Sequence, residues 1–127
     1  MIGLLDTHGL LWWLGDDRRV SARVRSILSD PANRILVSVA SAWEIAIKSA
    51  RGRMRLEVDP ARLREELLRE RLEPLPVELE HVVAVADLPP IHGDPFDRLL
   101  VAQARILRVP ILTADPHIAR YDVETIW

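Results

Sequence analysis

The chain has 127 residues, with 17 Lys and Arg against 19 Asp and Glu, a formal net charge of −2 and 49% hydrophobic residues. This composition excludes intrinsic disorder and predicts a single domain over residues 1–127. No apolar run approaches the roughly 18 residues of a membrane span, and the N-terminal segment has no basic head, so we expect a cytoplasmic protein without a membrane partner. Because the chain has no cysteine, any metal must bind to oxygen or imidazole ligands.

Apolar spacing and capping residues predict the elements of the first half of the chain. Strands are expected over 2–5 and 34–38, with helices over 7–14, from Ser21 to the stop at Asp30-Pro31, over 43–50 and over 60–71. Ser41 and Glu44 have the spacing of a capping box, which predicts that the third helix opens there and that Gly52 ends it. Asp59 before Pro60 predicts the N-cap of the fourth helix.

The second half alternates in the same way. We expect a short or peripheral strand over 72–76, a helix over 77–86, a loop over 88–95, a helix over 96–107, and strands over 109–113 and 123–126. Short strands separated by helices need crossover connections. The fold class predicted from the pattern is therefore α/β, with a parallel sheet covered by helices on both faces.

Four acidic residues fall at matching places in this pattern. Asp6 and Asp115 each follow a predicted strand, while Glu44 and Asp97 are expected in the first turns of helices. In a parallel sheet the functional crevice lies beyond the carboxyl ends of the strands, so all four carboxylates can converge there. Clustered carboxylates need a compensating cation, and oxygen ligands favour Mg²⁺ or Mn²⁺. Hydrolysis of a phosphodiester bond is the natural use of such a site.

Each acid also has an ordinary structural explanation. Asp at a strand-to-helix junction is commonly an N-cap, and Glu in a first helical turn is favoured by the helix dipole. Glu44 is the sharpest case, since it lies among apolar residues on a helix expected to pack against the sheet, where an unpaired acid is costly. Four acids together favour the functional interpretation over the structural one.

The segments that carry these acids resemble the VapC-type toxins of bacterial toxin–antitoxin operons, which are built on the PIN domain. The matching segments are LLDTHGLLWWL at 4–14, SAWEIAIKSARGRMRL at 41–56, HGDPFDRLLVAQA at 92–104 and ILTADPHIARY at 111–121. Together they span nearly the whole chain in the right order. Two departures are mild: Gly9 replaces the usual Ala, and Arg53-Met54 replaces Lys-Leu.

The resemblance implies a PIN-like three-layer α/β/α sandwich with a mainly parallel sheet of four to five short strands, and a metal-dependent endoribonuclease. It implies that Asp6 and Asp97 hold the principal Mg²⁺ (or Mn²⁺), and that Asp115 completes its shell or holds a second ion through water. Glu44 would orient or deprotonate the attacking water. Asp97 precedes an apolar turn as the family's third acid does, which leaves Asp94 as an N-cap or outer acid.

The partners implied by the resemblance are an RNA substrate, a second copy in a homodimer and a cognate antitoxin. The antitoxin's tail would fill the acidic groove, often with an Arg near the metal. The alternative is a non-catalytic PIN module that binds RNA or a protein. A signalling receiver domain is rejected, because it needs an acidic pair after its first strand and a Lys after its last strands, whereas Asp6 stands alone and the only Lys is Lys48.

Several neighbouring residues have two interpretations. The hydroxyls of Thr7 and Thr113 could bond a carboxylate or a metal-bound water, or could only satisfy backbone groups at the strand ends. The four histidines lack a ligand spacing, so surface or capping roles are expected, and His92 alone merits a test. Trp12 and Trp13 could stack on bases, but they are expected in the core or at an interface, and Trp43 is expected in the core. The basic stretch of Lys48, Arg51, Arg53 and Arg55 could attract phosphate or be a solvated helix end. Residues 62–71 mix both signs of charge and are expected to form a solvated helix face rather than a nucleic-acid patch.

Overall fold

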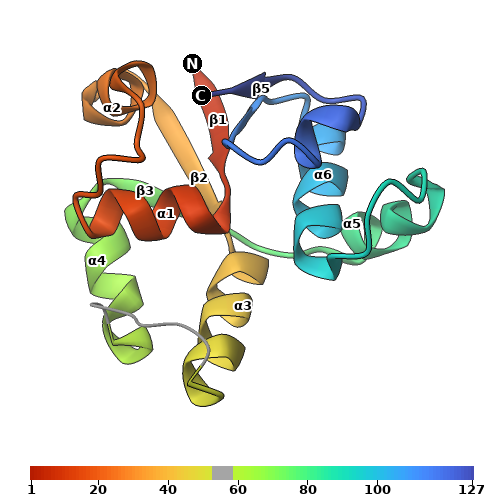
Figure 1. The fold of residues 1–127 in the computed structure, drawn as a ribbon, viewed down its shortest axis with the longest axis horizontal. Coiled ribbons are helices and arrows are strands. Elements are labelled where there is room, and N and C mark those ends of the chain that lie inside the picture. The colour runs from red at the N-terminus through yellow and green to blue at the C-terminus, as the bar shows by residue number, and fades with distance from the viewer. Residues whose placement is uncertain (53–58) are drawn as a thin grey trace.

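A parallel five-stranded sheet forms the centre of the molecule in a computed structural model, which describes residues 1–52 and 59–127. The strands are β1 (Ile2–Leu5), β2 (Arg34–Ser38), β3 (Leu72–Leu75), β4 (Ile111–Leu112) and β5 (Thr125–Ile126), in the spatial order β3-β2-β1-β4-β5 (Figure 1). Pro74 lies in β3, which is an edge strand, where a missing backbone donor is tolerated. The prediction of a parallel sheet is confirmed.

Helices cover both faces of this sheet (Figure 1). They are α1 (Thr7–Leu14), α2 (Ala22–Ser29), α3 (Val39–Ala50), α4 (Leu63–Arg69), α5 (Leu79–Ala84) and α6 (Pro95–Leu107), with short 3₁₀ turns η1 (Pro60–Arg62), η2 (Val85–Asp87) and η3 (Ile118–Arg120). Alternate strand residues face opposite layers, as the pleat requires. Leu5 belongs to the core cluster that includes side chains of α1 to α4, and Leu4 belongs to the cluster that includes side chains of α6 and η3. The predicted α/β/α sandwich is confirmed.

The start of α3 differs from the sequence prediction. The helix begins at Val39, four residues before the predicted opening, and its N-cap is Ser38, whose hydroxyl accepts from the backbone N–H of Ala40. The predicted capping box at Ser41 is wrong, because the buried Ser41 hydroxyl instead accepts a hydrogen bond from the Thr7 hydroxyl at 2.9 Å. Glu44 therefore lies in the second turn of α3, where the dipole of the helix N-terminus explains little.

Other boundaries shift by a few residues. Asp59 accepts from the N–H of Ala61, as predicted for an N-cap, but the first turn is the 3₁₀ helix η1 and α4 ends at Arg69. Arg71, with φ of 57°, turns the chain into β3, which a continued helix would not allow. The strands β4 and β5 are shorter than predicted, with two residues each.

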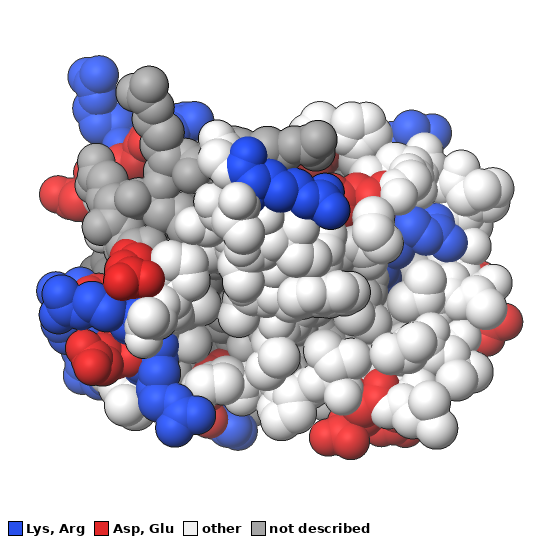
Figure 2. Space-filling model, turned by 90° about the horizontal axis from the view of Figure 1, so that it is seen from below, with Lys and Arg blue, Asp and Glu red and all other residues white. Residues whose placement is uncertain are grey.

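Charged side chains of both signs gather on the surface around α4 (Figure 2). Ion pairs link Arg62 to Glu65 and Arg69 to Glu66, and both signs mix on the left of Figure 2, where α4 lies, as expected for a solvated face. White atoms dominate the centre of the same view. Within residues 1–52 and 59–127, none of the helices combines the length and apolarity that crossing a membrane requires.

Candidate acidic site

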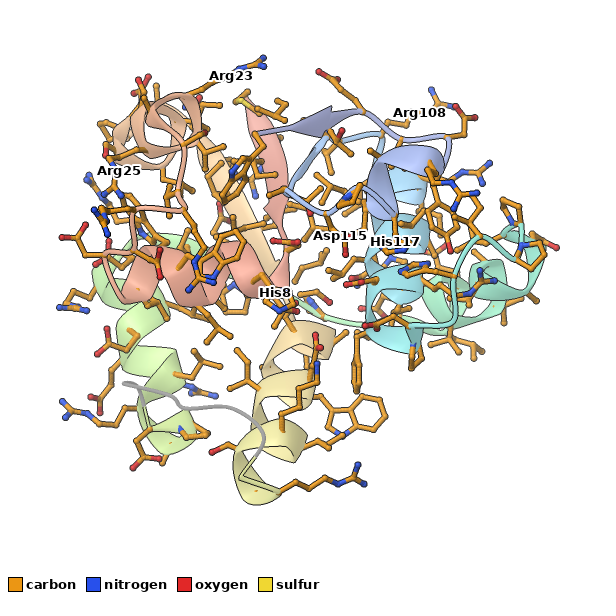
Figure 3. All side chains as sticks on the ribbon, viewed as in Figure 1. His8, Arg23, Arg25, Arg108, Asp115 and His117 are labelled. Atoms are coloured by element: carbon orange, nitrogen blue, oxygen red, sulfur yellow. The ribbon has the colours of Figure 1, made fainter. Side chains whose placement is uncertain are left out.

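Two of the four predicted acids follow the neighbouring strands β1 and β4, and the other two lie on the helices α3 and α6. Asp6 directly follows β1, and Asp115 lies three residues after β4, which pairs with β1. Glu44 comes from α3 and Asp97 from the first turn of α6. Asp115 lies between α1 and α6, with His8 and His117 on either side, whereas the labelled arginines lie at the periphery (Figure 3). The elements thus direct acidic side chains to the carboxyl edge of the sheet, as predicted.

Asp6 is buried and tightly held. One carboxylate oxygen accepts from the backbone N–H of Gly9 at 2.8 Å, which makes Asp6 the N-cap of α1, and the other accepts from the Thr113 hydroxyl at 2.6 Å. Burial raises the pKa of Asp6, and both hydrogen bonds oppose that change. A Cβ at Gly9 would lie 2.8 Å from Asp6 Oδ1, so the glycine allows this close contact. The carboxylate interpretation of Thr113 is confirmed, while Thr7 bonds Ser41 instead.

Asp97 is the electrostatic centre of the cluster. Its pKa is raised to about 8, first by burial and then by the negative charges of Asp94, Asp115, Asp6 and Glu44. Like charges raise an acid's pKa only when they lie nearby with little solvent between them. The structure therefore brings together the four acids that the sequence singled out, from four separate elements.

Glu44 is 2% exposed and has one partner. Its Oε2 accepts from the Lys48 ammonium one helical turn later at 2.5 Å, whereas Oε1 is buried without a hydrogen-bond partner among the described residues. The spacing of four residues on one helix was visible in the sequence and could have revealed this pair. An unsatisfied buried carboxylate oxygen is costly, which indicates a group available for another ligand.

Two histidines stand beside the acids. His92 Nε2 lies 3.3 Å from Asp97 Oδ2, and His117 Nδ1 lies 3.1 Å from Asp115 Oδ1. The two imidazole rings stack with centroids 5.4 Å apart and planes 7° apart. The surface or capping role predicted for the histidines holds for His81, which caps α5, but it is wrong for the largely buried His92.

Tyr121 and Arg98 extend this arrangement, and sequence reasoning missed both. The Tyr121 hydroxyl lies 2.7 Å from His92 Nδ1 and accepts from Arg98 at 3.0 Å. Arg98 also donates to the backbone carbonyl of Pro89 at 2.8 Å. No local spacing connects these residues, since Tyr121 lies 23 residues after Arg98. Asp94, by contrast, is the N-cap of α6 as predicted, with its carboxylate accepting from the N–H groups of Phe96 and Asp97.

Aromatic side chains border the acids. A hollow of about 220 Å³ is lined by Asp6, His8, Trp12 and Asp115. Trp12 packs edge to face on Trp127 and is partly buried. The core position predicted for Trp43 is wrong: its residue surface is 59% exposed and its ring contacts Phe96 edge to face at 5.2 Å.

The predicted basic stretch is only partly described. Arg53 and Arg55 lie outside the described residues. Lys48 is one of its members, and its ammonium pairs with Glu44. That pairing places one cation of the stretch within the acidic cluster rather than on a solvated helix end.

The donor set suits a hard divalent cation in its chemistry. Carboxylates that raise one another's pKa are stabilised by an ion, and Oε1 of Glu44 lacks a partner. Within residues 1–52 and 59–127, however, no three His, Asp or Glu side chains are spaced to hold an ion as they stand. Asp6 and Glu44 are instead engaged by Thr113 and Lys48. Ion binding would need these side chains to approach one another.

The fold and the acidic cluster together define the class of the protein: a parallel α/β sandwich with a carboxylate site at the carboxyl edge of its sheet. The chain belongs to the PIN domain family, whose sequence profile matches residues 3–124. Proteins of this family are typically nucleases and usually depend on a metal. No curated protein matches the chain by overall sequence comparison.

Solved structures share the fold at low sequence identity. The chain is similar to a chain of VapBC2 from Rickettsia felis, solved bound to a DNA fragment from their promoter, with a TM-score of 0.71, 15% identity and coverage of 100% of this chain and 99% of that one. It is also similar to a chain of VapBC-1 from nontypeable Haemophilus influenzae, with a TM-score of 0.64, 21% identity and coverage of 99% and 97%. A chain of a toxin–antitoxin complex from Klebsiella pneumoniae is similar as well, with a TM-score of 0.67, 16% identity and coverage of 98% of this chain and 96% of that one.

Proposed function

We propose that this chain is a single-domain, metal-dependent endoribonuclease and the toxin of a toxin–antitoxin pair. The observation that carries the proposal is the convergence of Asp6, Glu44 and Asp115 from separate elements on the largely buried Asp97, whose pKa burial and these charges raise to about 8. Such an acidic cluster at the carboxyl edge of the sheet lowers the stability of the folded protein, and groups with pKa values perturbed in this way gather at functional sites. Membership of the PIN family and the fold shared with toxin–antitoxin complexes support the same conclusion.

The residues that would hold Mg²⁺ or Mn²⁺ are Asp6, Asp97 and Asp115. A bound ion of this kind polarises a phosphodiester and lowers the pKa of an attacking water. Thr113 keeps the Asp6 carboxylate in one orientation by its hydrogen bond and also accepts from the backbone N–H of Asp115. One hydroxyl therefore ties the two strand-end acids to each other.

Glu44 is the proposed base. Its Oε1 has no hydrogen-bond partner among the described residues and so is free to accept a proton or a hydrogen bond from water. Lys48 pairs with the other oxygen, Oε2, and so fixes the orientation of the carboxylate.

The proposed partners are RNA, a cognate antitoxin and a second copy of the chain. Exposed apolar side chains on α3 and α5 support a protein partner; they are Val39, Trp43, Leu79, Val82 and Val83. Val83→Glu places a charge on this surface. If the second copy binds there, the variant should sediment as a monomer at concentrations where the native protein is a dimer, and an unchanged dimer would rule this surface out.

The test of the activity is incubation of the purified, antitoxin-free protein with total cellular RNA in Mg²⁺, in Mn²⁺ and in EDTA. We expect discrete products that require a metal and that disappear in Asp97→Asn. A matched control is Asp122→Asn, because Asp122 is exposed and lies beside Pro110 before β4, at the opposite end of the strand from the acids.

The outcomes separate the proposal from its alternative. Cleavage by Asp122→Asn but not by Asp97→Asn supports the endoribonuclease. RNA that stays whole with the native protein in both metals would contradict it and would favour a PIN module that binds RNA or a protein without cutting. Metal-dependent cleavage that survives Asp97→Asn would refute the role of Asp97.

A further inference from the structure

Behind Asp97, a chain of hydrogen bonds leads away from the acids into the protein. From Asp97 Oδ2 it passes to His92 Nε2 at 3.3 Å, from His92 Nδ1 to the Tyr121 hydroxyl at 2.7 Å, and from that hydroxyl to Arg98 at 3.0 Å. Tyr121 is buried, and the side chains of His92 and Asp97 are each 13% exposed. Water therefore has little access to these bonds.

The donors and acceptors along this chain have a single direction. A guanidinium can only donate, so the Tyr121 oxygen must accept from Arg98. An ionised Asp97 carboxylate can likewise only accept, so a neutral His92 ring beside it carries its proton on Nε2, the nitrogen that faces Asp97. Nδ1 is then bare and accepts the hydrogen of the Tyr121 hydroxyl.

We propose that Arg98 and Tyr121 hold His92 in its Nε2–H tautomer and that His92 in turn orients the carboxylate of Asp97. All three are therefore positioning residues. This inference rests on the proposed function, in which Asp97 binds the ion. In residues 1–52 and 59–127, the hydrogen bonds of the Asp97 side chain involve Oδ2 only, so the histidine holds one oxygen and leaves Oδ1 to a ligand.

Two further contacts fix the geometry of these hydrogen bonds. The His117 ring stacks on the His92 ring in nearly parallel planes, which limits the tilt of His92. Arg98 donates to the carbonyl of Pro89 at 2.8 Å and to that of Leu88 at 3.3 Å, so it is itself held by the loop that leads to His92. Residues that orient a metal ligand in this way commonly change metal affinity or activity about 10- to 100-fold when they are removed.

The first experiment reads the tautomer directly and needs no nuclease activity. Long-range proton–nitrogen NMR of the metal-free protein, at a pH above 8 where the Asp97 carboxyl is ionised, should show a protonated Nε2 and a bare Nδ1. In Tyr121→Phe, which loses the hydroxyl, we expect a mixture of the two tautomers. A native His92 with its proton on Nδ1 would overturn the proposal, whatever the variant does.

The second experiment uses two amides that imitate one imidazole nitrogen each. The amide nitrogen of His92→Gln can occupy the place of Nε2, whereas that of His92→Asn can reach only the place of Nδ1. We expect His92→Asn to weaken Mn²⁺ binding and RNA cleavage about 10- to 100-fold, with thermal unfolding showing that both variants fold. His92→Gln should keep most of the native Mn²⁺ binding and RNA cleavage.

Equal losses in the two variants, or none in either, would overturn the positioning role. A native protein that neither binds Mn²⁺ nor cuts RNA, yet shows the Nε2–H tautomer, would refute the proposed function and leave the hydrogen-bond chain intact. The two failures are therefore distinguishable.

Discussion

Replacing Asp97 with Asn should stabilise the protein as the pH rises, although it removes the proposed activity. The folded pKa of Asp97 is about 8, against an ordinary value of 3.8. The unfolded chain therefore loses this proton at lower pH than the folded chain does. Between these two pH values the folded state binds more protons, so the free energy of unfolding falls as the pH rises. Asn carries no proton to lose and is free of this penalty.

The size of the effect follows from the pH interval. Between pH 5 and pH 8, about 1.4 kcal/mol per pH unit gives a ceiling of about 4 kcal/mol. Solvent screening and movement of the neighbouring acids reduce it, and we expect the advantage of Asp97→Asn to grow by about 2 kcal/mol over this range. The amide keeps an oxygen that can accept from His92, so that hydrogen bond is largely retained.

Urea unfolding of both proteins in EDTA, at pH 5 and at pH 8, measures this difference. Asp122→Asn is the control, and we expect its pH dependence to match that of the native protein. The reasoning is refuted if the advantage of Asp97→Asn is the same at both pH values or shrinks toward pH 8. Saturating Mg²⁺ should then stabilise the native protein by about 2.7 kcal/mol at 100 times its Kd, and Asp97→Asn much less.

Three other substitutions test the surroundings of the site. Thr113→Val removes the hydroxyl that donates to Asp6 and should raise the pKa of Asp6 further; the expected cost in urea is about 1–3 kcal/mol, and a neutral result would mean that the hydrogen bond contributes nothing. Lys48→Met leaves Glu44 buried without a counter-ion and should cost about 3 kcal/mol, most of which Glu44→Gln in the same chain should restore. Leu100→Ala, in the fully buried core of α6, should cost about 2–5 kcal/mol while each folded molecule keeps its metal affinity; a lost affinity would show that the core positions Asp97.

Much of the fold was predictable because its signals are local. Apolar alternation and period place β1, α1 and α6 within a residue or two of their observed bounds. The acids were also predictable, since crossover connections bring the carboxyl ends of parallel strands to one edge. The start of α3 was not, because two serines compete for the cap and only the tertiary contact with Thr7 removes Ser41 from that competition.

The contacts around the acids depend on residues far apart in the chain. Trp43 looked like a core residue by its type, yet only the finished packing shows its ring exposed beside Phe96. His92 drew attention by its place near the acidic loop, but its partner Tyr121 comes 29 residues later, through no periodic pattern. Long-range side-chain pairs of this kind carry no signature in a single sequence.

The bond between Thr113 and Asp6 joins residues 107 positions apart, and this separation has a consequence for biosynthesis. A chain emerging from the ribosome presents β1, β2 and β3 first, and these strands can pair before β4 exists. Until translation has passed Asp115, Asp6 has neither its hydroxyl donor nor Asp115 beside it. The acidic cluster is therefore completed only after β4 has been made, later than the strands β1, β2 and β3 can pair.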